Sequence, residues 1–409
     1  MITDPLSTAY ITLAFELEQH IPGLVDAYFG PPELQARVQA STPRPPEAIA
    51  ASAADMREAV QASDYPTQRK GYLNAQLRAL ETLARVQAGV SITYRDQVRN
   101  CFDIEPRQVD ETLFDEANEQ LNALLPRPTP AATIAERMEA WKQQYVVSPS
   151  VAQQMIERIA AEARHRTSDI VTLPDGDYVG FELVTDKPWS GYNWYLGNTR
   201  SRIEINTDLP IHAHTLLDLV CHEAYPGHHA EHALKEQHLY RQRGWGEHSI
   251  QLINTPECVI SEGIATLAAS MIFDNDATAW AAAELYPLAG IVGDPQQEQQ
   301  IGEARRVVRG VAGNAALLLH EQGADSETVV QYLMRYSLNT EAEARHRLRF
   351  ISHPLWRVYI FTYHTGRDLL ARWLAQGDHF ERFRTLLTEQ IYPAQVEGWI
   401  IDEHRGCLD

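Results

Sequence analysis

A histidine followed directly by a glutamate, with further histidines shortly after, occurs in the segment His-Glu-Ala-Tyr-Pro-Gly-His-His at residues 222–229. In zinc hydrolases such imidazoles hold the metal, and the adjacent carboxylate takes a proton from a water molecule at the metal. The common motif places its two histidines one turn apart on one helix face. Here Pro226 occupies that second position. On a regular helix His229 would share the face of His222 but lie roughly 10 Å along it, too far for one zinc ion.

The Pro226–Gly227 pair offers a way to bring a later histidine back to the metal. Proline cannot donate a hydrogen bond to the carbonyl of His222, and glycine tolerates unusual backbone angles. If the pair adds two residues as a π-like bulge, His228 takes the place of the usual second ligand. We therefore expect His222 and His228 on the metal, with His229 as the alternative ligand or as a supporting group. The competing interpretation is a kinked, histidine-rich surface helix.

A hydrolytic zinc site also needs a third protein ligand, an open position for water and a general base. Glu262 is the best candidate ligand, because it lies early in an apolar helix where an unpaired carboxylate would be costly. Glu257 is the competing candidate for the third ligand. The alternative role for Glu262 is purely structural: a glutamate in the first turn stabilises the N-terminus of its helix. Glu223 is the expected general base. We expect one Zn²⁺ per chain, although manganese or cobalt also suits this ligand set.

The oxyanion of a hydrolysis reaction needs a hydrogen-bond donor besides the metal. Tyr363, Tyr359, His364 and Arg357 are the candidates near the C-terminal end of the chain, and composition does not choose among them. Arg349 or Arg357 could also bind the C-terminal carboxylate of a substrate, which favours short peptides.

Three segments together resemble the bacterial family known as domain of unknown function 885. They are residues 222–229, Ser-Glu-Gly-Ile-Ala at 261–265 and Tyr-His-Thr-Gly at 363–366. The family carries a His-Glu-x-x-Pro-Gly-His-His motif, then Glu-Gly-Trp, then Arg-Tyr…Pro…Tyr-x-x-Gly, and is grouped with the gluzincin-type zinc metallopeptidases. The resemblance runs from about residue 190 to the C-terminus and extends to residues 22–30.

The resemblance implies a role for each matching residue. It puts His222, His228 and Glu262 on zinc, makes Glu223 the general base and makes Tyr363 the oxyanion donor. The chain departs from the family pattern where Ile264 replaces Trp, where Arg-Phe replaces Arg-Tyr at residues 349–350, and in a longer spacing before the final tyrosine.

The elements that must position these residues can be read from apolar spacing. Helical periodicity predicts helices over residues 6–30 and through most of residues 47–168. Alternating and β-branched residues predict strands at 178–184, 192–196 and 201–206, directly before the helix of the metal motif. One of these strands, with Tyr192, Trp194 and Tyr195, could pair with extended substrate beside the metal.

These elements indicate a mainly α protein, a large helical chain with a small β-sheet beside the metal-binding helix, as in gluzincin-like zinc peptidases. We expect an N-terminal helical region at residues 1–169 and a metallopeptidase-like catalytic region at residues 170–409, packed as one compact unit.

The composition of the whole chain limits the classes of partner and the cellular compartments that are compatible with it. A formal charge of −20 over 409 residues argues against nucleic acid. The four cysteines, Cys101, Cys221, Cys258 and Cys407, form no CxxC pair, which is typical of a reducing compartment. The N-terminus lacks the pattern of a signal peptide, and apolar runs fall short of the ~20 residues of a membrane span. We therefore expect a cytoplasmic protein without a membrane partner, and its oligomeric state stays open.

The sequence thus predicts a zinc-dependent hydrolase, most simply a metallopeptidase acting on a peptide or another small amide. The alternative is a catalytically inactive helical binding module of the same family. A third reading is a carboxylate di-metal protein built on two Glu-x-x-His pairs, Glu162 with His165 and Glu343 with His346.

Overall fold

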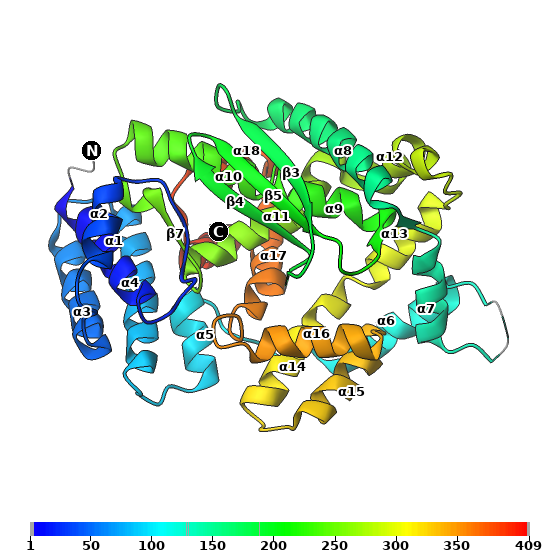
Figure 1. Cartoon of the computed structure of the whole chain (residues 1–409), viewed down its shortest axis with the longest axis horizontal. Coiled ribbons are helices and arrows are strands. Elements are labelled where there is room, and N and C mark those ends of the chain that lie inside the picture. Colours follow the sequence, from blue (N-terminus) through cyan, green and yellow to red (C-terminus); the bar gives the residue numbers. More distant parts are fainter. Residues whose placement is uncertain (1–3, 128, 130, 188, 407–409) are drawn as a thin grey trace.

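Helices make up most of the protein and surround small sheets of two or three strands (Figure 1). The computed structural model describes residues 4–127, 129, 131–187 and 189–406, so Cys407 lies outside the described residues. Cys101, Cys221 and Cys258 are buried and not in disulfides. The prediction of a mainly α fold with a small sheet beside the metal-motif helix is confirmed.

The first part of the chain is helical and contains two short strands that the sequence did not predict. Its helices are α1 (Pro5–Glu18), α2 (Pro32–Gln39), α3 (Pro46–Ala62), α4 (Thr67–Gln87), α5 (Tyr94–Phe102), α6 (Glu111–Leu124), α7 (Ile134–Gln143) and α8 (Pro149–Ile170). The predicted helix over residues 6–30 is wrong in its second half, because strand β1 (Val25–Tyr28) follows α1. Gly23, with a φ of +87°, helps to turn the chain between them.

The sheet before the metal motif has three strands, β3 (Tyr178–Val184), β4 (Gly191–Gly197) and β5 (Arg200–Asn206), all at the predicted places. β5 lies in the middle, parallel to β3 and antiparallel to β4, so β4 is an edge strand. Two further pairs bring distant segments together. Strand β2 (Val146–Val147) pairs with β6 (Ile211–His212), and β1 pairs with β7 (Ile250–Leu252).

Helices resume after the sheet and continue to the C-terminus. They are α9 (Ala213–Glu223), α10 (His228–Lys235), the π-helix η1 (Glu236–Gln242), η2 (Gly246–Ser249), α11 (Pro256–Phe273), η3 (Asp274–Asp276), α12 (Ala277–Glu284), η4 (Tyr286–Ala289), α13 (Pro295–Ala304), η5 (Val307–Gly310), α14 (Val311–His320), α15 (Ser326–Ser337), α16 (Glu341–Ser352), α17 (Ile360–Leu374), α18 (His379–Thr388) and α19 (Pro393–Gly406).

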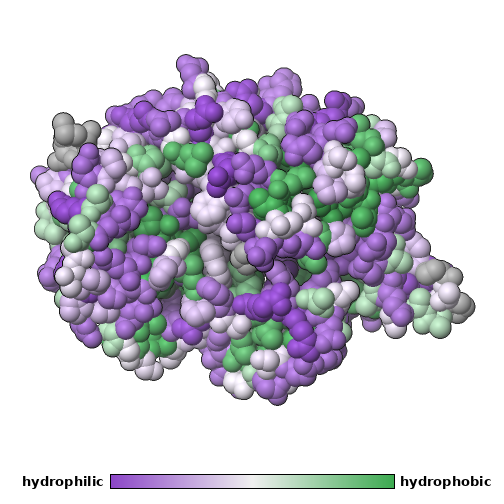
Figure 2. All heavy atoms as spheres, in the orientation of Figure 1, coloured by the Kyte–Doolittle hydropathy of each residue, from purple (hydrophilic) through white to green (hydrophobic). Residues whose placement is uncertain are grey.

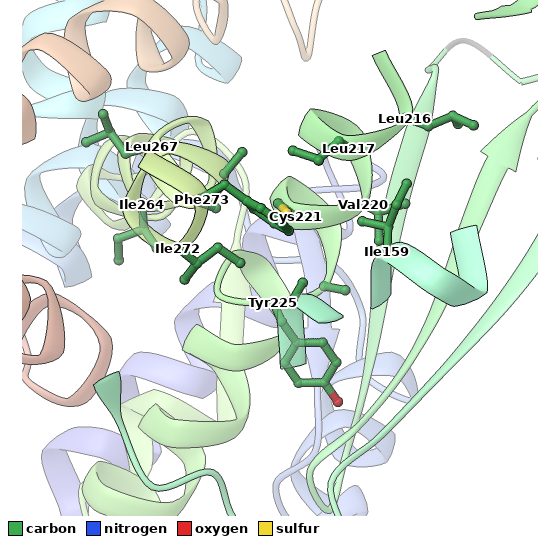
Figure 3. Close-up of a cluster of buried hydrophobic side chains, with 14 of the residues drawn as sticks. Ile159, Leu216, Leu217, Val220, Cys221, Tyr225, Ile264, Leu267, Ile272 and Phe273 are labelled. Carbon is green, nitrogen blue, oxygen red and sulfur yellow. The ribbon is translucent and has the colours of Figure 1, made fainter. Parts of the chain in front are cut away.

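The metal-motif helix α9 is held in the core between α8 and α11. Figure 3 shows Val220 and Cys221 of α9 between Ile159 of α8 and Ile264 and Phe273 of α11. These side chains are all almost fully buried. Burying an aliphatic side chain of this size stabilises a fold by roughly 1.5–3 kcal/mol. This packing fixes the helix that ends in the candidate metal ligands.

Helix α11 is the central helix of this region, in contact with both α9 and α17. Among the described residues it alone has the length and apolar composition of a membrane-crossing helix, and 78% of it is buried within the protein, as in the core helix of a globular fold. Hydrophilic residues cover most of the face shown in Figure 2, with small hydrophobic groups between them.

Contacts between the N-terminal helices and the rest of the chain are extensive. Besides the β1–β7 pair, Arg69 of α4 forms a buried ion pair with Glu247 of η2, with Nε and Oε1 2.8 Å apart. The division at residue 169 stays a prediction, and strand β1 shows that the N-terminal part reaches the region of the metal motif.

Candidate metal centre

The chain between the two predicted histidine ligands is a turn between two helices. Helix α9 ends at Glu223 and α10 begins at His228, with a cis peptide bond before Pro226. The amide of Gly227 donates to the carbonyl of Cys221 at 3.1 Å, a spacing of six residues. The predicted π-like bulge in a continuous helix is therefore wrong. The wide turn nevertheless accommodates the two residues by which the His222–His228 spacing exceeds the usual spacing of four.

Gly227 is required by the closeness of this turn to the helix before it. A Cβ atom at this position would lie 1.9 Å from the carbonyl oxygen of His222, a backbone atom that cannot move aside. The turn can fold back on α9 only with glycine here, and this return places His228 next to His222.

His222, His228 and Glu262 come together at the end of α9. Their candidate ligand atoms all lie within 4.8 Å of one another, the one such His/Cys/Asp/Glu group found in the described part of the chain. Glu262 Oε2 is 3.4 Å from His222 Nε2, and Glu262 Oε1 is 4.0 Å from His228 Nε2. A tetrahedral zinc with bonds of about 2 Å separates its ligand atoms by roughly 3.3 Å. Small side-chain movements would therefore suffice to hold the ion.

Glu262 carries an unsatisfied oxygen that points to a cation. Its Oε1 accepts a hydrogen bond of 2.8 Å from the hydroxyl of Tyr359. Its Oε2 is buried and accepts no well-formed hydrogen bond from any described residue, although it lies 3.4 Å from His222 Nε2. A buried carboxylate oxygen without a partner is costly, and a metal ion between it and the two imidazoles would remove that cost.

Hydrogen bonds behind His228 determine which ring nitrogen faces the centre. His228 Nδ1 lies 2.9 Å from Ser261 Oγ, and the Ser261 hydroxyl donates to Glu231 Oε2 at 2.6 Å. Because a hydroxyl has a single proton, Ser261 must accept from Nδ1–H, which leaves Nε2 with a free lone pair. Burial raises the pKa of Glu231, but Lys235, with Nζ 2.6 Å from Oε1, helps to hold it below the ordinary value.

Glu223 lies at the end of α9 with its carboxylate open to the pocket. Asn193 Nδ2 of strand β4 donates to the backbone carbonyl of Glu223 at 2.7 Å. A Cβ atom on Gly191 would lie 3.1 Å from Glu223 Oε1, so strand β4 passes directly against the side chain. The carboxylate accepts no hydrogen bond from a described residue. Burial raises the pKa of Glu223 above its ordinary value, and a nearby cation would lower it again.

The four candidate oxyanion donors differ in whether they line the pocket and in whether their donor group is already bound. Tyr363 and Tyr359 both line the pocket. The Tyr359 hydroxyl is bound to Glu262, whereas none of the described residues accepts a hydrogen bond from Tyr363. Arg357 donates to Gln97 at 2.5 Å, and neither it nor His364 lines the pocket. Tyr363 is therefore the free donor at the centre, and its catalytic role stays a prediction.

His229, the alternative ligand, points away from the centre. It is fully buried, with Nδ1 2.8 Å from Ser201 Oγ of strand β5 and Nε2 3.7 Å from Asp177 Oδ2. Asp177 also accepts a hydrogen bond from Tyr225 and pairs with Arg164 at 2.6 Å. His229 therefore ties the turn to the sheet and supports the ligand next to it.

Other residues considered from the sequence lie outside the group of three. Glu257 lines the pocket but accepts a hydrogen bond of 2.9 Å from Tyr72. The Glu-x-x-His pairs of the di-metal reading are engaged elsewhere: Glu162 pairs with Arg166, and Glu343 pairs with Lys142. The geometry gives these pairs no shared site.

The pocket around the centre has a volume of about 140 Å³ and includes a carboxylate that the sequence did not single out. Asp26 of strand β1 reaches it and accepts a hydrogen bond from Tyr192. Burial raises the pKa of Asp26 to about 6. Only the resemblance over residues 22–30 hinted at this position, because the segment had been expected to be helical.

Of the three aromatic residues proposed on β4, Tyr192 lines the pocket, while Trp194 and Tyr195 do not.

Comparisons with known proteins show a similar fold. No protein-family model and no curated protein matches the chain. The crystal structure of a "putative lipoprotein" from Colwellia psychrerythraea is similar, with a TM-score of 0.51 and 16% identity over 87% of this chain. The chain spans 66% of that protein, just under two thirds of its length. A "putative lipoprotein of unknown function" from Shewanella oneidensis gives a TM-score of 0.51 and 12% identity, covering 98% of this chain and 83% of that protein. At these identities the similarity concerns the fold alone.

Proposed function

We propose that this protein is a zinc-dependent hydrolase that cleaves the peptide bond of a peptide or another small amide. One Zn²⁺ per chain would be held by His222, His228 and Glu262. The observation that carries the proposal is the convergence of these three residues, with a buried, unpartnered carboxylate oxygen, next to the open carboxylate of Glu223. A structural or storage site would have no need of that additional carboxylate.

The residues around the centre have distinct chemical roles in this proposal. When bound, the zinc ion acts as a Lewis acid that lowers the pKa of a water molecule and polarises the substrate carbonyl. Glu223 accepts the proton of the attacking water and then delivers it to the leaving amine. Tyr363 donates a hydrogen bond to the developing oxyanion. Tyr359 keeps Glu262 oriented by its hydrogen bond to Oε1.

The pocket walls suit a peptide. Trp189, Tyr192 and Trp356 line it with aromatic surface, and edge strand β4 passes directly beside Glu223. An extended substrate backbone can pair with a strand that lacks a neighbour on one side.

Hydrolysis of a peptide library by the zinc-loaded protein tests the proposal. We expect the wild type to cleave peptides and Glu223→Gln to retain zinc but lose about 10²–10⁴-fold in rate, the usual contribution of a general base. Glu182→Gln, which alters an exposed glutamate of β3, is the matched control. A Glu223→Gln protein as active as the wild type would overturn the mechanism, and a wild type that retains zinc but cleaves nothing would overturn the function.

A cytoplasmic location remains part of the proposal. The similar structures are described as those of lipoproteins, a class that is attached to membranes by lipid. Fractionation of the native cells, with the protein detected in the soluble or the membrane fraction, decides between the two locations.

A further inference from the structure

A second cavity, of about 440 Å³, has a different chemical character from the pocket at the candidate centre. Arg305, Arg306, Arg309, Arg347 and Arg367 line it, and we call it the arginine cavity. The first three come from the segment that joins α13 to α14, and the other two from α16 and α17. Among the described residues that line the pocket at the candidate centre there is no arginine or lysine.

Four of these arginines form no ion pair in the part of the chain that the structure describes. Arg305, Arg306, Arg309 and Arg347 form no ion pair there, whereas Arg367 pairs with Asp368. This is unexpected in a chain whose 55 acidic residues outnumber its 35 basic ones. Carboxylates do occur on the cavity wall, at Asp218, Asp274, Glu298 and Glu303, but none of them is paired with these four guanidinium groups.

The arginines are crowded by protein and by one another, yet solvent reaches them. Arg306, Arg309 and Arg347 are exposed, and Arg305 is half-buried. Burial lowers the pKa of Arg305, the negative charge of Glu343 opposes this shift, and the positive charges of Arg309 and Arg347 add to it. The planar guanidinium group matches the geometry of carboxylate and phosphate, so an open cavity lined by several of them suits an anion of this kind.

The arginine cavity lies one helical turn from the candidate centre on three separate helices. On each helix, a residue that lines the cavity is four positions from a residue at the candidate centre. The pairs, with the cavity residue first, are Asp218 and His222 on α9, Thr266 and Glu262 on α11, and Arg367 and Tyr363 on α17. Helix α16 likewise contributes Phe350 to the pocket and Arg347 to the cavity. Figure 1 shows α17 running from the neighbourhood of α16 to α11.

We propose that the arginine cavity binds a carboxylate of the peptide whose scissile bond lies at the candidate centre. The inference rests on the proposed peptidase function and names its substrate class, a short peptide with a free carboxylate. One to two helical turns span roughly 5–11 Å, and an extended peptide rises about 3.3 Å per residue. The carboxylate would therefore lie about two to three residues beyond the scissile bond. Arg349 and Arg357, suggested for this role by the sequence, line neither space.

Binding to a protein that does not turn over its ligand tests this proposal. Zinc-loaded Glu223→Gln protein is titrated by calorimetry with tetra-alanine, with tetra-alanine amide, and with an Ala-Ala-Ala-Glu amide whose one carboxylate is a side chain. We expect tetra-alanine to bind at least about tenfold more tightly than its amide, as charge-assisted hydrogen bonds to guanidinium groups require. The glutamate amide shows whether a side-chain carboxylate serves as well as the C-terminal one.

The preference for a carboxylate should depend on arginines of the cavity and on no others. We expect it to be lost in Arg309→Gln and Arg347→Gln, each made in the Glu223→Gln protein. Both residues lack an ion pair among the described residues, so their replacement leaves no carboxylate without its partner. Arg335→Gln, at an exposed arginine of α15 that pairs with Asp115, should leave the preference unchanged.

Equal binding of all three peptides, a preference that survives both cavity variants, or no binding of any peptide would overturn the inference. Its failure is distinguishable from failure of the proposed function. Library hydrolysis by the wild type without a carboxylate preference refutes the inference alone. A carboxylate preference without any hydrolysis refutes the function alone.

Discussion

The hydrogen bond behind His228 offers a sharp test of how the candidate centre is organised. Ser261 Oγ lies between His228 Nδ1 and Glu231 Oε2, at 2.9 and 2.6 Å. In Ser261→Ala, the imidazole loses the acceptor that fixes its tautomer and orientation. Glu231 keeps its bond to Lys235 but loses one donor in a fully buried position.

The size of the effect follows from these two losses. Removing the group that orients a metal-bound histidine typically lowers metal affinity by about 10–100-fold, which corresponds to roughly 1.4–2.7 kcal/mol. The unsatisfied carboxylate should also lower the free energy of unfolding of the metal-free protein by about 1–3 kcal/mol. Zinc affinity should therefore be measured on protein shown by circular dichroism to be folded.

Competition with a zinc-binding dye gives the affinity of the wild type and of each variant. Ser270→Ala is the matched control, because it removes from the same helix a hydroxyl whose one hydrogen bond among the described residues is to the carbonyl of Leu267, at 2.7 Å. Wild-type zinc affinity in Ser261→Ala would refute the orienting role of this hydrogen bond. An equal loss in Ser270→Ala would show that the effect is a general one of α11.

Three further perturbations test the framework around the centre. Arg69→Met should destabilise the protein by about 3–5 kcal/mol in urea unfolding, because it leaves Glu247 as an uncompensated buried charge. Burial raises the pKa of Glu298 from 4.5 to about 7. The folded state therefore retains a proton that the unfolded chain releases, and the free energy of unfolding should fall as pH rises through this window, by roughly 3 kcal/mol in all. Glu298→Gln should lack that part of the pH dependence in urea unfolding measured at several pH values. Gly227→Ala should abolish high-affinity zinc binding in the dye assay, because its Cβ would meet the carbonyl oxygen of His222.

Each of these outcomes can be contradicted directly. An Arg69→Met protein as stable as the wild type would show that the buried pair is replaceable by apolar packing. Parallel pH profiles for Glu298→Gln and the wild type would mean that this carboxyl does not hold a proton in the folded state. Normal zinc affinity in Gly227→Ala would show that the turn has another conformation, and Gly398→Ala, where a Cβ meets open space in helix α19, is its control.

The sequence predicted the parts of the site that depend on local pattern. The apolar spacing around Glu262 predicted a buried helix, and the His-Glu motif predicted a second one. The structure brings the candidate ligands of these two helices together. The three strands before the motif were recognisable by their alternating and β-branched residues.

Features that depend on pairing between distant segments were not predictable. Strand β1 forms because Val25–Tyr28 pairs with Ile250–Leu252, more than two hundred residues away, and this pairing overrides the helical pattern of residues 6–30. Asp26 was missed for the same reason. The wide turn at Gly227 could be anticipated as an irregularity, but its course depends on hydrogen bonds to Cys221 and on contacts of His229 with the sheet. The arginine cavity likewise collects residues from several elements, and no local motif marks it.

The central claim, that His222, His228 and Glu262 hold a zinc ion, is tested most directly by metal content. The protein is purified without a histidine tag, incubated with zinc, desalted and measured by elemental analysis as wild type, Glu262→Ala and Glu257→Ala. We predict about one zinc per chain in the wild type and in Glu257→Ala, whose glutamate lines the pocket outside the group of three, and a near-complete loss in Glu262→Ala. A wild type that retains no zinc, or a Glu262→Ala protein that keeps it, would contradict the account.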